Sequence, residues 1–126
     1  MFLLTREHIE IIHAENIETF SGNPGYYENT RNKIESILAQ QYPMFGYDKY
    51  PSIFEKAAML MYFFVKGHCF VDGNKRVGIL TMLIFLRINY IDIQCEDEDI
   101  IDLGLGIAMG KYNTAHIVEW ISLYSQ

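Results

Sequence analysis

Two apolar stretches, AAMLMYFFV at residues 57–65 and VGILTMLIFL at residues 77–86, stand on either side of the polar segment KGHCFVDGNKR at residues 66–76. Both stretches are far shorter than the roughly 18 apolar residues that predict a membrane-spanning helix. They therefore predict two core helices joined by a polar loop. The helix from about residue 73 to 89 is apolar on nearly all sides, which favours a central position in the fold.

The composition describes a small acidic domain. The chain has 126 residues, with 10 Lys and Arg against 16 Asp and Glu, so its formal net charge is −6. Half of the residues are hydrophobic, which is enough for a core and too many for a disordered segment. Because a nucleic-acid-binding surface needs a basic face, we expect no direct contact with nucleic acid. We expect one domain over residues 1–126.

Simple sequence features favour the cytoplasm. The first residues lack the basic start, apolar region and cleavage site of a secretion signal. Cys69 and Cys95 form no CxxC pair for zinc, and two thiols in a chain with its own core fit a reducing compartment. We therefore expect a cytoplasmic protein without a membrane segment.

The remaining sequence predicts further helices and very little strand, so the expected fold class is all-α, with about six helices around the central one. Periodicity and capping signals predict a helix capped by Thr5, one after residue 29, one from Pro51 to about residue 66, one with an acidic first turn at 96–99, and a last helix capped by Thr114. Segment 42–50 mixes aromatic residues with Pro and Gly, which predicts a loop or short hairpin.

The start of the central helix has the features of an anion site. A helix that begins near Gly73 and Asn74 presents unpaired backbone N–H groups and the positive end of its dipole, which together suit a phosphate. Lys75 and Arg76 add positive charge in the first turn. Cations at that end oppose the helix dipole unless an anion is bound, so their position favours a phosphate ligand over ordinary surface charge.

Two further side chains of the loop suit group transfer. Asp72 could hold a hydrated Mg²⁺ that bridges phosphates, although a helix N-cap is its other interpretation. His68 could take a proton from a hydroxyl near pH 7. Together with the anion site, these residues indicate nucleotidyl or phosphoryl transfer. Cys69 is interpreted as a small buried residue rather than a nucleophile, and His13 is given no role.

The nine residues 68–76, HCFVDGNKR, resemble the H-x-F-x-[D/E]-G-N-x-R motif of the Fic/Doc family. Lys75 in the variable position resembles the Doc, or death-on-curing, branch. A Gly-x-Pro-Gly turn at residues 22–25 and the sequence FLRIN at 85–89 extend the resemblance over essentially the whole chain. The resemblance implies a single compact helical domain with a short flap.

The resemblance also implies a transferase that uses ATP and Mg²⁺ to modify a hydroxyl of a target protein. In it, His68 would activate the hydroxyl, Asp72 would hold the metal, and Phe70 would pack into the core to fix the loop. The nucleotide- and phosphate-binding residues would be Gly73, Asn74, Lys75, Arg76 and Lys66. The flap that docks the target would include Phe45, Gly46 and Tyr47, although a plain loop over the core is the other interpretation of that segment.

The type of transfer follows from two departures from the usual Fic motif. Typical Fic proteins transfer AMP and carry Gly at the position of Lys75 and a second Arg at the position of Ile79. Lys75 and Ile79 in place of these residues favour a nucleotide that is bound in the reverse direction to that of typical Fic proteins. Its γ-phosphate would then face His68, and the protein would be a kinase acting on Ser or Thr. The resemblance implies a toxin whose target is a translation elongation factor. Transfer of AMP by the same residues is the alternative, and a catalytically silent binding module is the alternative of another class.

Inhibition is expected to come from another chain. Family members that inhibit themselves carry an [S/T]-x-x-x-E-[G/N] motif, and no Ser or Thr of this chain is followed four residues later by Glu. The resemblance therefore implies an antitoxin that acts in trans.

Overall fold

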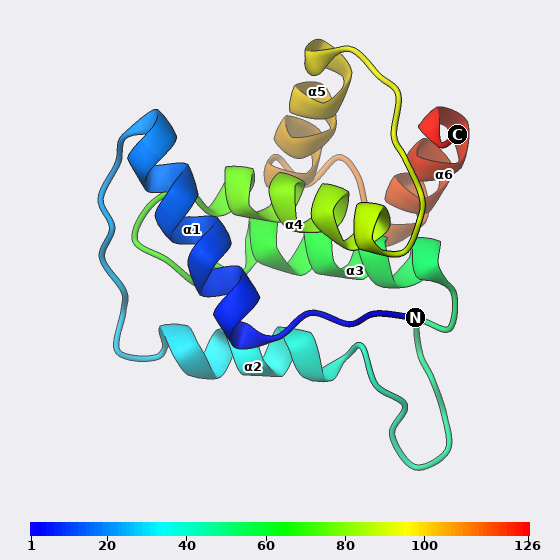
Figure 1. The fold of residues 1–126 in the computed structure, drawn as a ribbon, viewed down its shortest axis with the longest axis horizontal. Coiled ribbons are helices and arrows are strands. Elements are labelled where there is room, and N and C mark those ends of the chain that lie inside the picture. The colour runs from blue at the N-terminus through cyan, green and yellow to red at the C-terminus, as the bar shows by residue number, and fades with distance from the viewer.

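The computed structural model describes all 126 residues, which fold into six α-helices without a strand (Figure 1). The helices are α1 (Arg6–Phe20), α2 (Thr30–Ala39), α3 (Ile53–Lys66), α4 (Asn74–Ile88), α5 (Asp97–Ala108) and α6 (Thr114–Tyr124). The all-α prediction with six helices is confirmed. None of these helices combines the length and hydropathy that crossing a bilayer requires.

Two helix starts differ from the prediction. The hydroxyl of Ser52 accepts a hydrogen bond from a backbone N–H in the first turn of α3, so Pro51 lies before the cap and not in the first turn. The side chain of Asn113 caps α6 in the same way, and Thr114 is the first helical residue. Both capping residues have the extended backbone that an N-cap requires.

The core is centred on α3 and α4, which lie side by side in the middle of the molecule (Figure 1). Eight of the 14 residues of α3 are buried, against six of the 15 in α4. The predicted central helix therefore shares that position with α3, which is the more buried of the two. The apolar pattern of α4 predicted a helix that is covered on nearly all sides. Ile84 is nevertheless 37% exposed, so this part of α4 is apolar but faces solvent.

Segment 42–50 is a loop with a tight turn at residues 44–47. Met44 and Tyr47 exchange two backbone hydrogen bonds of 2.8 and 2.9 Å, and Phe45 at the tip is fully exposed. The loop is tied to α3 by Lys56, a buried residue whose ammonium lies 2.8 Å from a carboxylate oxygen of Asp48. This hydrogen bond lowers the pKa of Asp48.

Helix α4 lies close against α3 at Gly78. A Cβ atom at this position would lie 2.5 Å from Val65 Cγ2 and 3.0 Å from the carbonyl oxygen of Met61. We expect Gly78→Ala to lower the free energy of unfolding by about 1–3 kcal/mol, because the two backbones must separate. This cost outweighs the helix propensity that Ala gains. Urea unfolding followed by circular dichroism measures the change.

Gly104→Ala in α5 is the matched control. Its added Cβ would meet only the side chains of Ile79 and Lys75, which can move, so we expect no loss of stability. An equal loss of stability in the two variants, or no loss in Gly78→Ala, would contradict a close crossing at Gly78.

Candidate functional site

The motif loop, residues 67–73, connects α3 to α4 through two left-handed backbone positions. His68 has φ of 48° and Gly73 has φ of 83°. Gly adopts this region freely, whereas for His it is uncommon and costs energy. A strained backbone at a polar residue is a feature that clusters at functional sites, and it requires neighbours that hold the loop in place.

The first of these neighbours is Asn74, which closes the loop. Its Oδ1 accepts a hydrogen bond from the backbone N–H of Phe70 at 3.0 Å, and its Nδ2 donates to the carbonyl oxygen of Phe70 at 2.8 Å. The side chain of Asn74 is therefore committed to the loop, and only its backbone N–H is free to face a phosphate. The predicted role of Asn74, a backbone N–H at the anion site, does not require its side chain.

Phe70 itself anchors the loop in the core, where it is 1% exposed. Its ring stacks on the ring of His13 with centroids 3.8 Å apart and lies edge-on to Tyr26. The Nε2–H of His13 donates to the carbonyl oxygen of Asp72 at 3.1 Å. Burial lowers the pKa of His13, and the bond to Asp72 opposes this shift. His13 thus acts as a neutral support of the loop, a role that no sequence motif indicated.

Helix α2 holds the other side of the loop. The hydroxyl of Thr30 donates to the carbonyl oxygen of Cys69. The ammonium of Lys33 donates to the carbonyl oxygens of Gly67 at 3.0 Å and His68 at 3.4 Å. Neither residue was predicted to matter, because their partners lie more than 30 positions away in the sequence.

Asp72 bonds to backbone groups on both sides of it. One carboxylate oxygen accepts the N–H of Gly73 at 2.9 Å and the other accepts the N–H of Asn23 at 3.2 Å. Gly73 is the N-cap, and no side chain caps α4, so the N-cap interpretation of Asp72 is wrong. The backbone N–H groups of residues 74–76 consequently donate to no acceptor in the protein, as an anion site requires.

The buried side chain of Asn16 lies behind this helix start. Neither its amide nitrogen nor its oxygen has a hydrogen-bond partner. A Cβ atom on Gly73 would lie 2.8 Å from Asn16 Nδ2. Glycine at position 73 is therefore required twice, by its left-handed backbone and by the close approach of α1.

A cavity of about 420 Å³ lies at the start of α4. It is lined by Val65, His68, Val71, Asp72, Gly73, Asn74, Lys75, Arg76 and Ala108. We call this space the motif cavity. Every predicted site residue of segment 68–76 lines it except Phe70, which supports it from the core. Val65, Val71 and Ala108 were not predicted as site residues.

The basic residues around the motif cavity are not neutralised by the protein. Lys66, Lys75 and Arg76 take part in none of the ion pairs of the structure. The guanidinium of Arg76 lies 4.4 Å from the centre of the Phe20 ring, which positions it without cancelling its charge. Lys66 is exposed and does not line the cavity, so the structure does not group it with the other phosphate-binding candidates.

His68 also borders a second hollow on the side of α2. This hollow, of about 680 Å³, is lined by Tyr27, Glu28, Asn29, Asn32, Lys33 and His68. A third hollow of about 400 Å³ shares three of these residues and continues along α2 to Gln40 and Phe63. We call the two together the α2 groove. His68 is the only residue that lines both the motif cavity and the α2 groove.

The expected flap lies elsewhere. Phe45, Gly46 and Tyr47 belong to the loop that precedes α3, whereas the motif loop follows α3, so the two lie at opposite ends of this helix (Figure 1). None of the three lines the motif cavity or the α2 groove. The three residues therefore lie apart from His68, and their role in docking a target stays a prediction.

The metal and thiol chemistry of the site is limited. No group of three or more His, Cys, Asp or Glu could hold a metal ion by itself, and Asp72 is the only carboxylate that lines the motif cavity. A Mg²⁺ ion there would take its remaining ligands from phosphate and water, which is how this ion usually binds.

Burial raises the pKa of Cys69 to about 11, so its thiol stays protonated near neutral pH and is no nucleophile.

Comparison with known proteins agrees with this geometry. Residues 3–86 match the Fic/DOC family. The chain belongs to the Fic/Doc family. It is 27% identical over 116 residues to "Protein kinase doc" of Escherichia phage P1, which covers 92% of this chain and 90% of the relative. It is 33% identical over 61 residues to "Toxin Doc" of Mycolicibacterium smegmatis, which covers 48% of this chain and 47% of that relative. Both relatives carry the name Doc, so the chain falls in the Doc branch of the Fic/Doc family.

The clamp between Asn74 and Phe70 is open to a direct test. Asn74→Ala leaves the N–H and C=O of Phe70 without their partners, so we expect the free energy of unfolding to fall by about 1–3 kcal/mol. Asn32→Ala is the control, because this exposed amide makes no hydrogen bond within the protein and its loss should change little. Urea unfolding measures both variants, and a small effect in both would contradict the clamp.

Proposed function

We propose that this Fic/Doc protein is a Doc-like toxin that transfers the γ-phosphoryl group of ATP to a Ser or Thr hydroxyl of a target protein. The observation that supports the proposal is the position of His68 between the motif cavity and the α2 groove. A base that removes the proton of the target hydroxyl must lie where this hydroxyl meets the phosphoryl donor. The base therefore lies between the two binding sites.

The donor side is the motif cavity. Free backbone N–H groups at the start of α4 and the unpaired charges of Lys75 and Arg76 suit the phosphates of ATP. Asp72 is the carboxylate that would hold Mg²⁺, which neutralises phosphate charge when bound. To hold the metal, one oxygen of Asp72 can keep its bond to the loop, since each carboxylate oxygen has a second lone pair.

The chemical step is carried by His68. The imidazole takes the proton of the acceptor hydroxyl while the hydroxyl oxygen forms a bond to the γ-phosphorus. The bond between this phosphorus and the bridging oxygen of ADP breaks, and ADP leaves with the electron pair. Lys75 and Arg76 stabilise the charge on the phosphoryl oxygens. The exposed ring of His68 makes no hydrogen bond to the protein, so it is free to meet a hydroxyl.

The acceptor side is the α2 groove. Its walls carry amide side chains such as Asn29, Asn32 and Gln40, which can donate to and accept from the backbone of an extended segment. Ile37 and Phe63 make its far end apolar. Because α2 has ten residues, the groove is about 15 Å long and accommodates roughly four or five residues of extended chain.

The biological setting follows from the Doc branch. We propose an elongation factor as the target and an antitoxin chain as the inhibitor. The word toxin in the name of the Mycolicibacterium smegmatis relative supports a toxin–antitoxin pair, and the word kinase in the name of the phage relative supports phosphoryl over AMP transfer.

Labelled ATP distinguishes phosphoryl from AMP transfer. The chain is incubated with a purified bacterial elongation factor and with ATP labelled at either the α or the γ phosphate. We expect only the γ label to enter the target, and we expect His68→Ala to lower the rate at least ~100-fold because the base is lost.

Lys66→Ala is the control and should retain most of the rate, since Lys66 lies outside the motif cavity. Entry of the α label alone would replace the kinase by an AMP transferase. Growth inhibition that His68→Ala leaves unchanged would overturn an enzymatic function altogether.

The α2 groove is tested by filling it. Ser36 lines the groove and is exposed, so we expect Ser36→Trp to raise the KM for the protein target at least ~10-fold while the KM for ATP changes less than ~2-fold. Glu35→Trp places the same bulk on the neighbouring residue, which lines neither hollow, and should have little effect. An unchanged KM in Ser36→Trp would show that the target docks elsewhere.

A further inference from the structure

An exposed aromatic ring at the end of α1 contacts a residue of the motif cavity. Phe20, the last residue of this helix, is 55% exposed. The guanidinium carbon of Arg76 lies over its ring, 4.4 Å from the centre. Two other cations of the chain lie over aromatic rings at 5.6 and 5.8 Å, so this contact is the shortest of the three. It is also the one that involves a residue of the motif cavity.

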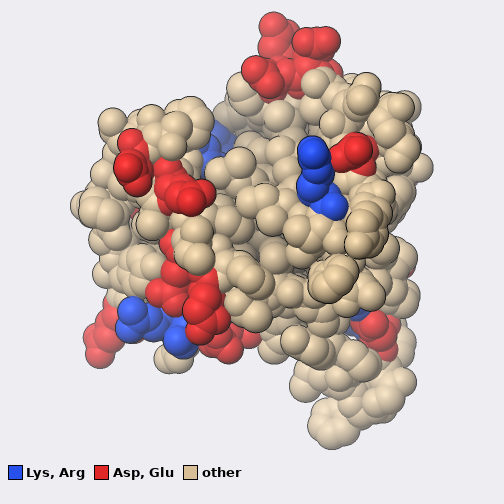
Figure 2. Space-filling view, in the orientation of Figure 1, with Lys and Arg blue, Asp and Glu red and all other residues tan.

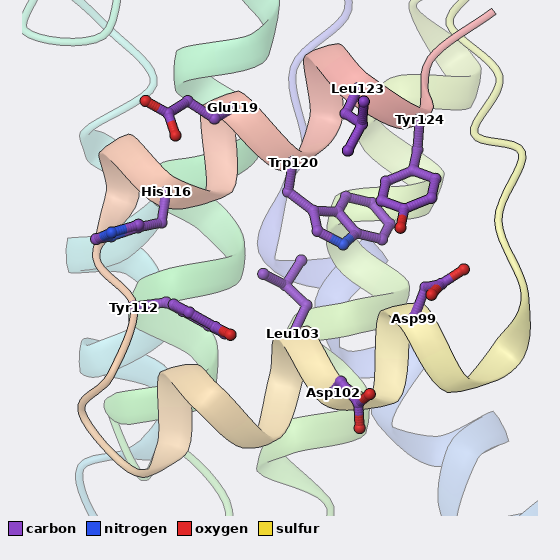
Figure 3. A pocket seen from close by; sticks show the side chains of 9 residues that line it. All are labelled: Asp99, Asp102, Leu103, Tyr112, His116, Glu119, Trp120, Leu123 and Tyr124. Atoms are coloured by element: carbon purple, nitrogen blue, oxygen red, sulfur yellow. The ribbon is translucent and has the colours of Figure 1, made fainter.

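Another group of aromatic side chains has no such contact. The cleft between α5 and α6, with a volume of about 370 Å³, is walled in part by the rings of Trp120 and Tyr124, whose centroids lie 4.5 Å apart (Figure 3). No Lys or Arg lines this cleft, and none of its residues lines the motif cavity. The cleft therefore has no part in the anion site, whereas the ring of Phe20 touches it through Arg76.

The contact leaves the charge and the hydrogen-bonding edge of Arg76 available. A ring face attracts a guanidinium electrostatically, and a guanidinium that covers a ring still directs N–H groups outward along its edge. These groups suit two oxygens of one phosphate, which a guanidinium binds in a bidentate manner. An exposed Arg otherwise samples many conformers, and the entropy lost in ordering it weakens binding. A ring that orders Arg76 beforehand therefore increases the affinity for a phosphate.

The turn that follows α1 fixes the position of this ring. Ser21 has φ of 66° and ψ of 167°, a conformation that residues other than Gly rarely adopt and that persists only where the surrounding structure imposes it. Two residues further on, the backbone N–H of Asn23 donates to a carboxylate oxygen of Asp72 at 3.2 Å. The turn is therefore bonded to the motif loop, and Phe20 is held between this turn and its own helix.

We propose that Phe20 is a positioning residue for Arg76, whose guanidinium it holds in the orientation that binds a phosphate of ATP. The inference rests on the proposed function, which makes ATP the donor. Phe20 lies outside the nine-residue motif and does not line the motif cavity. It therefore acts on the nucleotide through Arg76, and its effect on binding requires that Arg76 is present.

A double-mutant cycle on nucleotide binding tests this requirement. Isothermal titration calorimetry measures the Kd of the non-hydrolysable β,γ-imido analogue of ATP, with Mg²⁺, in the unmodified chain, in Phe20→Leu, in Arg76→Gln and in the double variant. Phe20→Leu keeps an apolar side chain and removes the ring face, so we expect Kd to rise at least ~3-fold. Arg76→Gln should raise Kd at least ~10-fold. Adding Phe20→Leu to Arg76→Gln should then change Kd less than ~1.5-fold.

Two further variants serve as controls. Phe20→Tyr keeps the ring and should bind within ~1.5-fold of the unmodified chain. Phe2→Leu makes the same exchange at a Phe that is 61% exposed and lies under no cation, and it should leave Kd unchanged. Circular dichroism verifies that each variant is folded.

The outcomes separate this inference from the proposed function. An unchanged Kd in Phe20→Leu would overturn the inference. An equal loss of affinity with and without Arg76 would also overturn it, because the ring would then act on the fold and not on Arg76. If the analogue binds with the expected dependence on Arg76 but no γ label enters a target, the positioning role stands and the kinase proposal falls. Absence of binding to the unmodified chain would overturn both.

Discussion

The site depends on the two hydrogen bonds between the side chain of Asn74 and the backbone of Phe70. They join the first residue of α4 to the middle of the motif loop, so the loop cannot straighten without breaking both. The left-handed backbone of His68 costs on the order of 1–3 kcal/mol and persists only when its surroundings impose it. The ring of Phe70, buried against α1, holds the loop from the core. Because the loop is bonded to the first residue of α4, the N–H groups at the anion site are held with it.

Charge is distributed unevenly over this acidic chain. Its net charge is −6, yet Lys75 and Arg76 have no ion-pair partner beside a helix start whose own dipole is positive. Such an arrangement costs stability in the free protein and is repaid when an anion binds. Apart from Asp72, many of the acidic side chains lie elsewhere, over α1, α2 and the start of α5 (Figure 2). Lys75 and Arg76 therefore form a local positive site in a chain whose net charge is negative.

The sequence predicts the helices and the motif loop, which are local features. It does not predict the contacts between the motif loop and distant helices. The apolar helices, the loop between them and the residues that the motif contributes to the cavity follow from patterns over at most 20 neighbouring positions each. His13, Thr30 and Lys33 hold the loop from helices 30 to 60 positions away, and no periodicity or motif in a single sequence connects such partners. The position of the 42–50 loop escaped prediction for a similar reason. Its distance from His68 is set by the length of α3, which separates the two loops.

Under the proposed function, the place of His68 on a loop, and not on a helix, suits transfer between two large ligands. A residue within a packed helix presents its side chain to one side only, because the helix covers the other. At the turn between α3 and α4, His68 is exposed and borders a hollow on each side. The helix that lines the acceptor side is also the one that fixes the backbone of His68, through the ammonium of Lys33. Under the proposed function, a segment bound in the α2 groove therefore lies against the group that holds the base, and target binding and the orientation of His68 are physically linked.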